Sequence, residues 1–193
     1  MSMLHGIATF FGKALRNVHA GEGKIAFNDP RLACDSRLAI EADGLTQGGP
    51  LPLRYTKDGG DASPPIRWSG VPDTARELVL LCEDPDAPLP TPFVHWVVYR
   101  ISPAWGSLPE GLAKDAIPDA PTFVLQGKNT TRKPGYTGAA PPLGHGAHRY
   151  HFQLFALDEP IRLEAGATRD EVVRAMEGHV VAKGELVATY ERA

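Results

Sequence analysis

The chain has 193 residues, of which 42% are apolar and 22% charged, a balance typical of one globular domain that buries its own core. The formal net charge of -3 is too small to indicate a nucleic-acid partner, and no apolar run reaches the ~18 residues that a membrane span needs. Cys34 and Cys82 are too few for a disulfide framework. We therefore expect a cytoplasmic protein with reduced cysteines.

The first two dozen residues show helical periodicity. Apolar residues recur at helical spacing from Leu4 to Val18, with Lys13 and Arg16 on the opposite side. We predict an amphipathic helix or arm over residues 1–24 and a single β-sandwich-like domain over residues 25–193. The arm is expected to dock on its own domain or on a second copy of the chain. A helix lying on a membrane surface is the alternative.

Beyond Ala33, prolines and glycines divide the chain into short extended pieces. Many short strands between turns predict a mostly β fold, a sandwich or barrel, and not alternating β-α-β units. One helix is predicted after Thr168, because Thr168 and Glu171 form a capping box and Gly178 is a typical helix end. A second helical turn is predicted at Pro109–Ala113. The candidate strands are Leu38–Ala42, Leu53–Tyr55, Ile66–Trp68, Glu77–Glu83, Val94–Ile101, Phe123–Leu125, Arg149–Leu157 and Glu185–Tyr190.

The first candidate site segment begins where an apolar strand ends at Asp84. Pro85 cannot donate a ladder hydrogen bond, so strand pairing stops there, and Pro88 stiffens the turn that follows. The next strand begins near His95. A hairpin-like return therefore brings His95 close to Asp84.

The second candidate segment runs from Pro141 and Pro142 to His148 and Tyr150. Alternate residues of a strand share a face, so His148 and Tyr150 lie on the same side as the apolar Phe152. That face is polar at the strand mouth and apolar deeper in, which suits a small pocket walled by the paired prolines. The neighbouring His145 and His151 are expected to be exposed or structural.

These residue types suit the binding of a small anion. A carboxylate at Asp84 fixes the tautomer of a nearby imidazole or favours its charged form, and imidazolium suits phosphate. The hydroxyl of Tyr150 and backbone amides would add donors. Because an ionised Asp84 would repel an anion, the hypothesis requires that this charge be paired or protonated.

Two other chemistries remain open at this point. Asp84, His95 and His148 would supply three zinc ligands, although the chain has no H-E-x-x-H motif or cysteine pair at ligand spacing. A hydrolase is the other alternative, although no G-x-S-x-G motif is present. Each residue also has a purely structural interpretation, such as a turn or a buried histidine. We expect no enzyme activity, no cofactor and no metal.

Taken in order, the segments resemble the signatures of the phosphatidylethanolamine-binding protein family. Asp84-Pro-Asp-Ala-Pro followed by Pro92-Phe-Val-His-Trp-Val-Val-Tyr resembles the first signature. Pro141-Pro142-Leu-Gly followed by His148-Arg-Tyr-His-Phe-Gln-Leu-Phe-Ala-Leu resembles the second. Ser63-Pro-Pro-Ile-Arg-Trp68 resembles the entry segment of its bacterial Raf-kinase-inhibitor-like branch. The likeness extends from Ala33 to Arg192.

The resemblance implies an antiparallel Greek-key β-sandwich with short peripheral helices and a small anion pocket. Members of the family bind lipid headgroups, inhibit kinases or proteases and modulate signalling, and the bacterial branch often forms homodimers. The expected ligand is thus phosphate, phosphoethanolamine or a carboxylate. A protein partner is also expected, with inhibition or scaffolding through the surface as the alternative function. The pocket residues implied are Asp84, Pro88, His95, Pro141, Pro142, His148 and Tyr150.

The chain departs from the family pattern in two places. Ala139-Ala140 stands where the family has glycine, or proline and cysteine, before the paired prolines, and alanine does not readily adopt positive φ. The chain also ends soon after Tyr190, without the C-terminal helix that flanks the pocket in animal members. We therefore expect a more open pocket, or one covered by a partner subunit or by the N-terminal helix.

Overall fold

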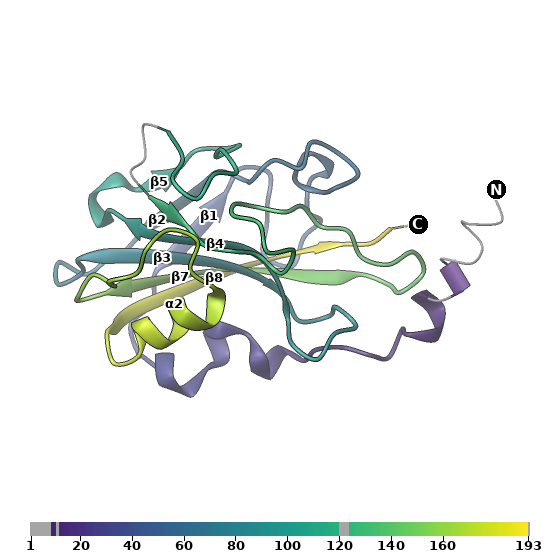
Figure 1. Cartoon of the computed structure of the whole chain (residues 1–193), viewed down its shortest axis with the longest axis horizontal. Helices are drawn as coiled ribbons and strands as arrows, with labels where there is room; N and C mark the ends of the chain where they lie inside the picture. Colours follow the sequence, from purple (N-terminus) through teal and green to yellow (C-terminus); the bar gives the residue numbers. More distant parts are fainter. Residues whose placement is uncertain (1–8, 11, 120–123, 193) are drawn as a thin grey trace.

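The computed structural model, which describes residues 9–10, 12–119 and 124–192, contains two antiparallel sheets packed face to face (Figure 1). The larger sheet has the strand order β6-β4-β3-β7-β8, and the smaller has the order β1-β2-β5. The sequence-based prediction of a mostly β, antiparallel sandwich is confirmed. The strands are β1 (Ala39–Ala42), β2 (Ile66–Ser69), β3 (Glu77–Asp84), β4 (Phe93–Ile101), β5 (Ser107–Leu108), β6 (Leu125–Gln126), β7 (His148–Leu157) and β8 (Val180–Tyr190).

Short helices surround the sheets. Helix α2 (Arg169–Met176) has the predicted capping box: the Thr168 hydroxyl accepts a hydrogen bond from the Glu171 amide, and the Glu171 carboxylate accepts one from the Thr168 amide. Gly178, with φ of 82°, follows the helix end as expected. The 3₁₀ helices are η1 (Glu22–Lys24), η2 (Ala26–Asn28), η3 (Pro30–Leu32), η4 (Leu53–Tyr55) and η5 (Pro103–Trp105). Within the described parts of the chain, no helix has the length and apolarity required to cross a membrane.

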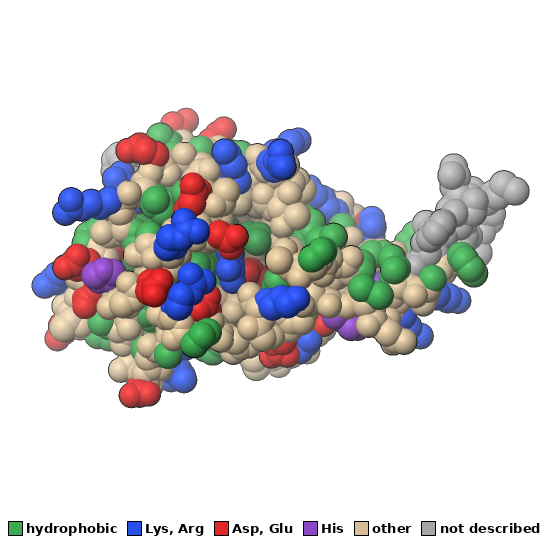
Figure 2. Space-filling view, turned by 60° about the horizontal axis from the view of Figure 1, so that its bottom comes forward, with side chains coloured by type: hydrophobic (Ala, Val, Ile, Leu, Met, Phe, Trp, Pro, Cys, Tyr) green, Lys and Arg blue, Asp and Glu red, His purple; other side chains and the backbone are tan. Residues whose placement is uncertain are grey.

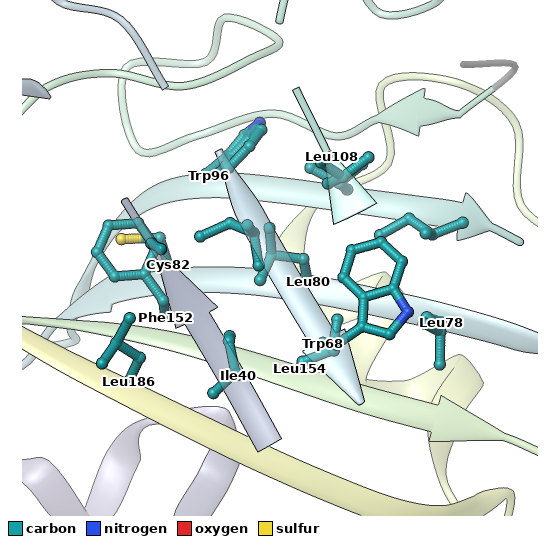
Figure 3. Packing of buried hydrophobic residues seen from close by; sticks show 14 of the residues in the cluster. Ile40, Trp68, Leu78, Leu80, Cys82, Trp96, Leu108, Phe152, Leu154 and Leu186 are labelled. Atoms are coloured by element: carbon teal, nitrogen blue, oxygen red, sulfur yellow. The ribbon is translucent and has the colours of Figure 1, made fainter. Parts of the chain in front are cut away.

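The main core lies between the two sheets. Alternate residues of β3 and β7 point toward the smaller sheet, so their side chains interdigitate with those of β1 and β2 (Figure 3). Full burial of one such side chain contributes about 1.5–3 kcal/mol. The central members of this cluster are Ile40, Trp68, Leu78, Leu80, Cys82, Trp96, Phe152 and Leu154.

The opposite face of the larger sheet is also covered. Val79 and Leu81 of β3 and Phe155 of β7 pack against Val172 and Met176 of α2, with η2 and η3 completing the cover beside the helix (Figure 1). Burial on both faces explains why β3 reads as an almost uninterrupted apolar run rather than an alternating one. The predicted division of β7 into two differently facing sets of side chains is confirmed.

Two predicted elements differ in type. Leu53–Tyr55 forms the 3₁₀ helix η4 and not a strand, because the Tyr55 amide bonds the carbonyl of Pro52 three residues earlier (2.9 Å). A three-residue apolar segment carries too little periodicity to separate the two states. Pro109–Ala113 is a turn and not a helical segment, because Gly111 takes φ of 67° and reverses the chain.

The last strand begins earlier than the sequence suggests. β8 starts at Val180, whereas the predicted strand starts at Glu185, directly after Lys183 and Gly184. The buried Lys183 ammonium is satisfied by the carbonyl oxygens of Phe27 (2.7 Å) and Leu32 (3.2 Å). The two-residue strand β5 was not predicted, and part of the predicted strand at Phe123–Leu125 lies outside the described residues.

The N-terminal segment borders the loop that contains the paired prolines. Residues 9–10 and 12–14 are helical, whereas Leu4, Ile7 and Phe11 of the predicted helix lie outside the described residues. A Cβ added at Gly12 would lie 2.0 Å from the carbonyl oxygen of Leu143, so the two backbones touch there. Farther along, the Ala20 amide bonds the Ala87 carbonyl at 3.0 Å. The segment extends from one end of the sandwich (Figure 1).

We predict that Gly184→Ala destabilises the protein by about 1–3 kcal/mol, since overpacking a filled site costs this much. A Cβ at Gly184 in β8 would lie 2.4 Å from the Leu38 carbonyl oxygen, where the chain entering β1 crosses β8. Gly23→Ala is the control, because a Cβ there would meet nothing within 4 Å. Urea denaturation of both variants measures the difference, and equal unfolding free energies would contradict this account of β8.

Candidate functional site

A cavity of about 380 Å³ opens where β3 ends and where β4 and β7 begin. Because β3 pairs antiparallel with both neighbours, its last residue lies beside their first residues. Six of the seven predicted site residues line this cavity, and Tyr150 does not. The lining consists of Lys57, Asp84, Ala87, Pro88, Leu89, Phe93, His95, Thr131, Thr137, Gly138, Ala140, Pro141, Pro142 and His148.

Every oxygen of the Asp84 carboxylate is hydrogen-bonded within the protein. One oxygen accepts the backbone amides of Asp86 (2.8 Å) and Ala87 (3.1 Å), which fixes the turn after β3. The other lies 2.7 Å from Nδ1 of His148. Asp84 is 4% exposed, so its carboxylate has lost its hydrogen bonds to water, and these bonds within the protein take their place.

His148 is the middle member of a chain of hydrogen bonds. Its Nε2 lies 2.7 Å from Nδ1 of His145, whose Nε2 lies 2.8 Å from the carbonyl oxygen of Leu15 in the N-terminal segment. His145 was expected to be exposed or structural; it is 2% exposed and hydrogen-bonded directly to His148. The H-x-x-H spacing across the Gly146 turn was the signal that sequence reasoning did not use.

The number of protons in this series of hydrogen bonds gives the net charge of its side chains. The Leu15 carbonyl can only accept, so Nε2 of His145 carries a proton, and each of the three hydrogen bonds needs one proton. Two neutral imidazoles supply two. The third hydrogen bond, between His148 and Asp84, needs a proton of its own. With one proton in each of the three hydrogen bonds, the three side chains together carry no net charge.

His95 offers the cavity a lone pair and not a proton. Its Nδ1 donates to the Thr137 carbonyl (2.6 Å), and the Thr137 amide donates back to the His95 carbonyl (2.9 Å). Burial lowers the pKa of His95, so the ring is neutral at neutral pH. With the proton on Nδ1, Nε2 is the acceptor nitrogen left for a ligand.

Comparison with known proteins places the chain in a family. The family model described as phosphatidylethanolamine-binding protein matches residues 41–191. The chain belongs to this family. A UPF0098 protein of Methanothermobacter thermautotrophicus is 44% identical over 158 residues, covering 80% of this chain and 99% of the relative. A UPF0098 protein of Pyrococcus abyssi is 45% identical over 142 residues, covering 74% of this chain and 79% of the relative.

Solved structures agree with the fold. The putative phosphatidylethanolamine-binding protein homologue CT736 of Chlamydia trachomatis has a TM-score of 0.73 and 36% identity, covering 82% of this chain and all of that one. YbcL of Escherichia coli, described as a new member of the mammalian family, has a TM-score of 0.76 and 27% identity over the same shares. The Raf-kinase-inhibitor-like branch stays a prediction.

In this member of the phosphatidylethanolamine-binding protein family, Tyr150 lies behind the cavity wall. Its ring packs edge-on against His95, with centroids 5.1 Å apart, and its buried hydroxyl has no hydrogen-bond partner among the described residues. Burial, and next the charge of Asp84, raise the pKa of Tyr150, so the hydroxyl stays protonated. Tyr150 therefore supports the His95 ring and does not face the cavity directly.

The loop at Ala139-Ala140, which departs from the family pattern, needs no positive φ at either alanine. Ala139 is fully buried and its carbonyl accepts the Lys57 amide (2.9 Å), while neither alanine has positive φ. Glycine is therefore not required at this position. The contact also brings Lys57, which sequence reasoning missed, to the cavity. Among the described residues that line the cavity, Lys57 is the only lysine or arginine.

The three-ligand zinc arrangement does not fit this geometry. Both ring nitrogens of His148 and the Nδ1 of His95 are held in hydrogen bonds. No three His, Cys, Asp or Glu side chains in the described part of the chain are grouped so that they could hold one ion. A larger cavity of about 640 Å³ beside α2, around Lys24, Lys128 and Arg169, contains none of the predicted site residues.

Asp86 lies in the turn that follows β3 and connects this turn to Arg149 of β7. Its carboxylate accepts three hydrogen bonds from Arg149, from the backbone amide (2.9 Å), Nε (2.8 Å) and Nη2 (2.8 Å). Burial raises the pKa of Asp86, but the Arg149 donors outweigh it and hold the pKa below its ordinary value. Arg149 also reaches the exposed Glu22 of η1 (2.5 Å). The cavity wall at Pro88 is thus held by an ion pair on the far side of β7.

We predict that Asp86→Asn lowers the free energy of unfolding at pH 7 by about 2 kcal/mol, because hydrogen bonds to a charged acceptor contribute about that much. Glu22→Gln removes an exposed contact of the same arginine and should cost less than about 1 kcal/mol. The folded-state pKa of Asp86 is depressed, so its contribution is present above its ordinary pKa, near 3.8, and is lost as pH falls further. Urea denaturation from pH 3 to 7 should show the wild-type and Asp86→Asn curves converging at acid pH, and a constant gap would contradict this.

Proposed function

We propose that the cavity binds a small anion, such as phosphate, phosphoethanolamine or a carboxylate, and that the protein acts by binding and not by catalysis. The observation that carries the proposal is the hydrogen-bonded chain of Asp84, His148 and His145, in which the Asp84 carboxylate has an imidazole partner. His95 Nε2 is then the side-chain group available to a ligand, and Lys57 is the lysine of the lining, with its ammonium on Asp61. The description of the matched family model as phosphatidylethanolamine-binding supports a headgroup-like ligand.

Binding is expected to take up a proton. Neutral His95 presents a lone pair, so an anion is held either through its own remaining proton or after the ring gains a second one. In both cases the complex contains one proton more than the free protein and the fully ionised anion. Affinity therefore falls as pH rises. A permanently charged imidazolium at His95 would instead attract the anion without any uptake of a proton.

The hydroxyl groups of the cavity support binding rather than hydrolysis. Thr131 and Thr137 supply the hydroxyls of the lining, and that of Thr131 bonds Oδ1 of Asn129 (2.6 Å) and not an imidazole. A hydroxyl nucleophile needs a base within hydrogen-bond reach. His148 is bonded on both nitrogens to other side chains and is not placed as that base.

The N-terminal segment supports a proposed homodimer. Phe10, Leu15 and Val18 are 69%, 40% and 45% exposed, and hydrophobic side chains gather where this segment leaves the body (Figure 2). Exposed apolar groups of this kind mark protein contacts. The same surface would serve the alternative function, inhibition of a protein partner in the cytoplasm through surface contacts.

We predict that phosphoethanolamine binds more weakly as pH rises from 6 to 8, by up to about tenfold per unit, with uptake of one proton. Titration calorimetry in two buffers of different ionisation enthalpy measures both quantities. His95→Gln should weaken binding and flatten the pH dependence. His151→Gln is the matched control, because His151 is equally buried in β7 but bonds Glu185 on the opposite face (2.9 Å).

The outcomes separate the parts of the proposal. Absence of binding of phosphate, phosphoethanolamine and acetate at millimolar concentration would overturn the anion-binding function. Binding whose affinity does not change from pH 6 to 8 would remove proton uptake from the account. Equal effects of His95→Gln and His151→Gln would show that His95 acts only through stability.

A further inference from the structure

The cavity adjoins a second one, and Lys57 lies between them. The second cavity, about 430 Å³, shares Lys57, Thr131 and Thr137 with the first and is also lined by Lys114 and Lys133. The Nζ of Lys57 lies on Asp61, which lines the second cavity and not the first. The conformation of the Lys57 side chain therefore decides which of the two cavities holds its charge.

The ammonium group of Lys57 is paired with Asp61, a carboxylate that has a second lysine as partner. Its Nζ lies 2.6 Å from Oδ2 of Asp61, but the Nζ of Lys114 lies 2.6 Å from the same oxygen. The Gly138 amide donates to the other oxygen of Asp61 (2.6 Å). Burial raises the pKa of Asp61, yet Lys114 and Lys57 lower it on balance, so it is ionised. If the Lys57 ammonium moved away, Asp61 would keep its ion pair with Lys114 and its hydrogen bond from the Gly138 amide.

The first cavity needs the charge that Lys57 carries. Asp84 and His148 belong to the hydrogen-bonded chain without net charge, and His95 is neutral. An anion enclosed by such walls is costly unless it meets a positive charge. Lys57 is the lysine or arginine that lines this space in the described chain, and its side chain is 42% exposed, which leaves its flexible stem free to turn.

We propose that Lys57 transfers its ammonium group from Asp61 to the bound anion, while Lys114 keeps Asp61 paired. This inference rests on the proposed anion-binding function. The charge count then selects the ligand class. Binding brings one ammonium and one proton to the anion, two positive charges in all, which balance the dianion of a phosphate monoester. A phosphodiester, such as the phosphate of an intact phospholipid, has one negative charge. It has no proton that it could donate to Nε2 of His95.

The test compares two lysines that contact the same oxygen. Binding of phenyl phosphate, a monoester, and of methyl phenyl phosphate, a diester, is measured by titration calorimetry at pH 7. Lys57→Met should weaken binding of the monoester at least tenfold, whereas Lys114→Met should change it less than threefold. The wild-type protein should bind the diester at least tenfold more weakly than the monoester. Thermal unfolding of both variants checks that they fold.

Each result bears on a different statement. Equal weakening by Lys57→Met and Lys114→Met would assign Lys57 a structural role at Asp61 and overturn the inference, while the anion-binding function would stand. Equal affinity of the wild type for the two esters would overturn the monoester class. Failure of the wild type to bind phenyl phosphate, inorganic phosphate or acetate would instead overturn the proposed function itself.

Discussion

The hydrogen bond between Asp84 and His148 joins the end of β3 to the start of β7, and much of the site depends on it. The same carboxylate holds the turn that carries Pro88, and the same imidazole reaches His145 and through it the N-terminal segment. Removing either partner would leave an uncompensated buried group, which costs about 3–5 kcal/mol. The turn that carries Pro88 and the N-terminal segment are thus both linked to this hydrogen bond.

Sequence alone predicts well where β3 ends and where β7 begins. Asp84 and His148 mark points where apolar strands meet proline turns, and antiparallel pairing of β3 with β7 brings such points together whatever the loops do. The placement of Tyr150 on the inward face follows from strand alternation. That it lies behind His95 does not, because this depends on how two rings pack in three dimensions.

Two partners were not predicted from the sequence, although the H-x-x-H spacing offered a signal for one of them. The contact of His145 with His148 depends on the path of the loop after Pro142, which is held by the N-terminal segment and not by local propensity. Lys57 reaches the cavity because η4 turns where a strand was expected, and because its amide bonds the Ala139 carbonyl. Both residues bear on the proposed chemistry: the imidazoles pair with Asp84, and Lys57 is the residue proposed to bring a positive charge to a ligand.

The protonation of the histidine chain can be observed directly. Nitrogen-15 NMR of histidine-labelled protein at pH 7 should show three ring N–H protons shared by His145 and His148, and one on His95, in the wild type. Asp84→Asn should reduce the first number to two, because the carboxylate charge no longer retains the third proton. Two neutral rings in the wild type, with only two protons between them, would leave Asp84 as a net negative charge in the cavity wall and contradict the account.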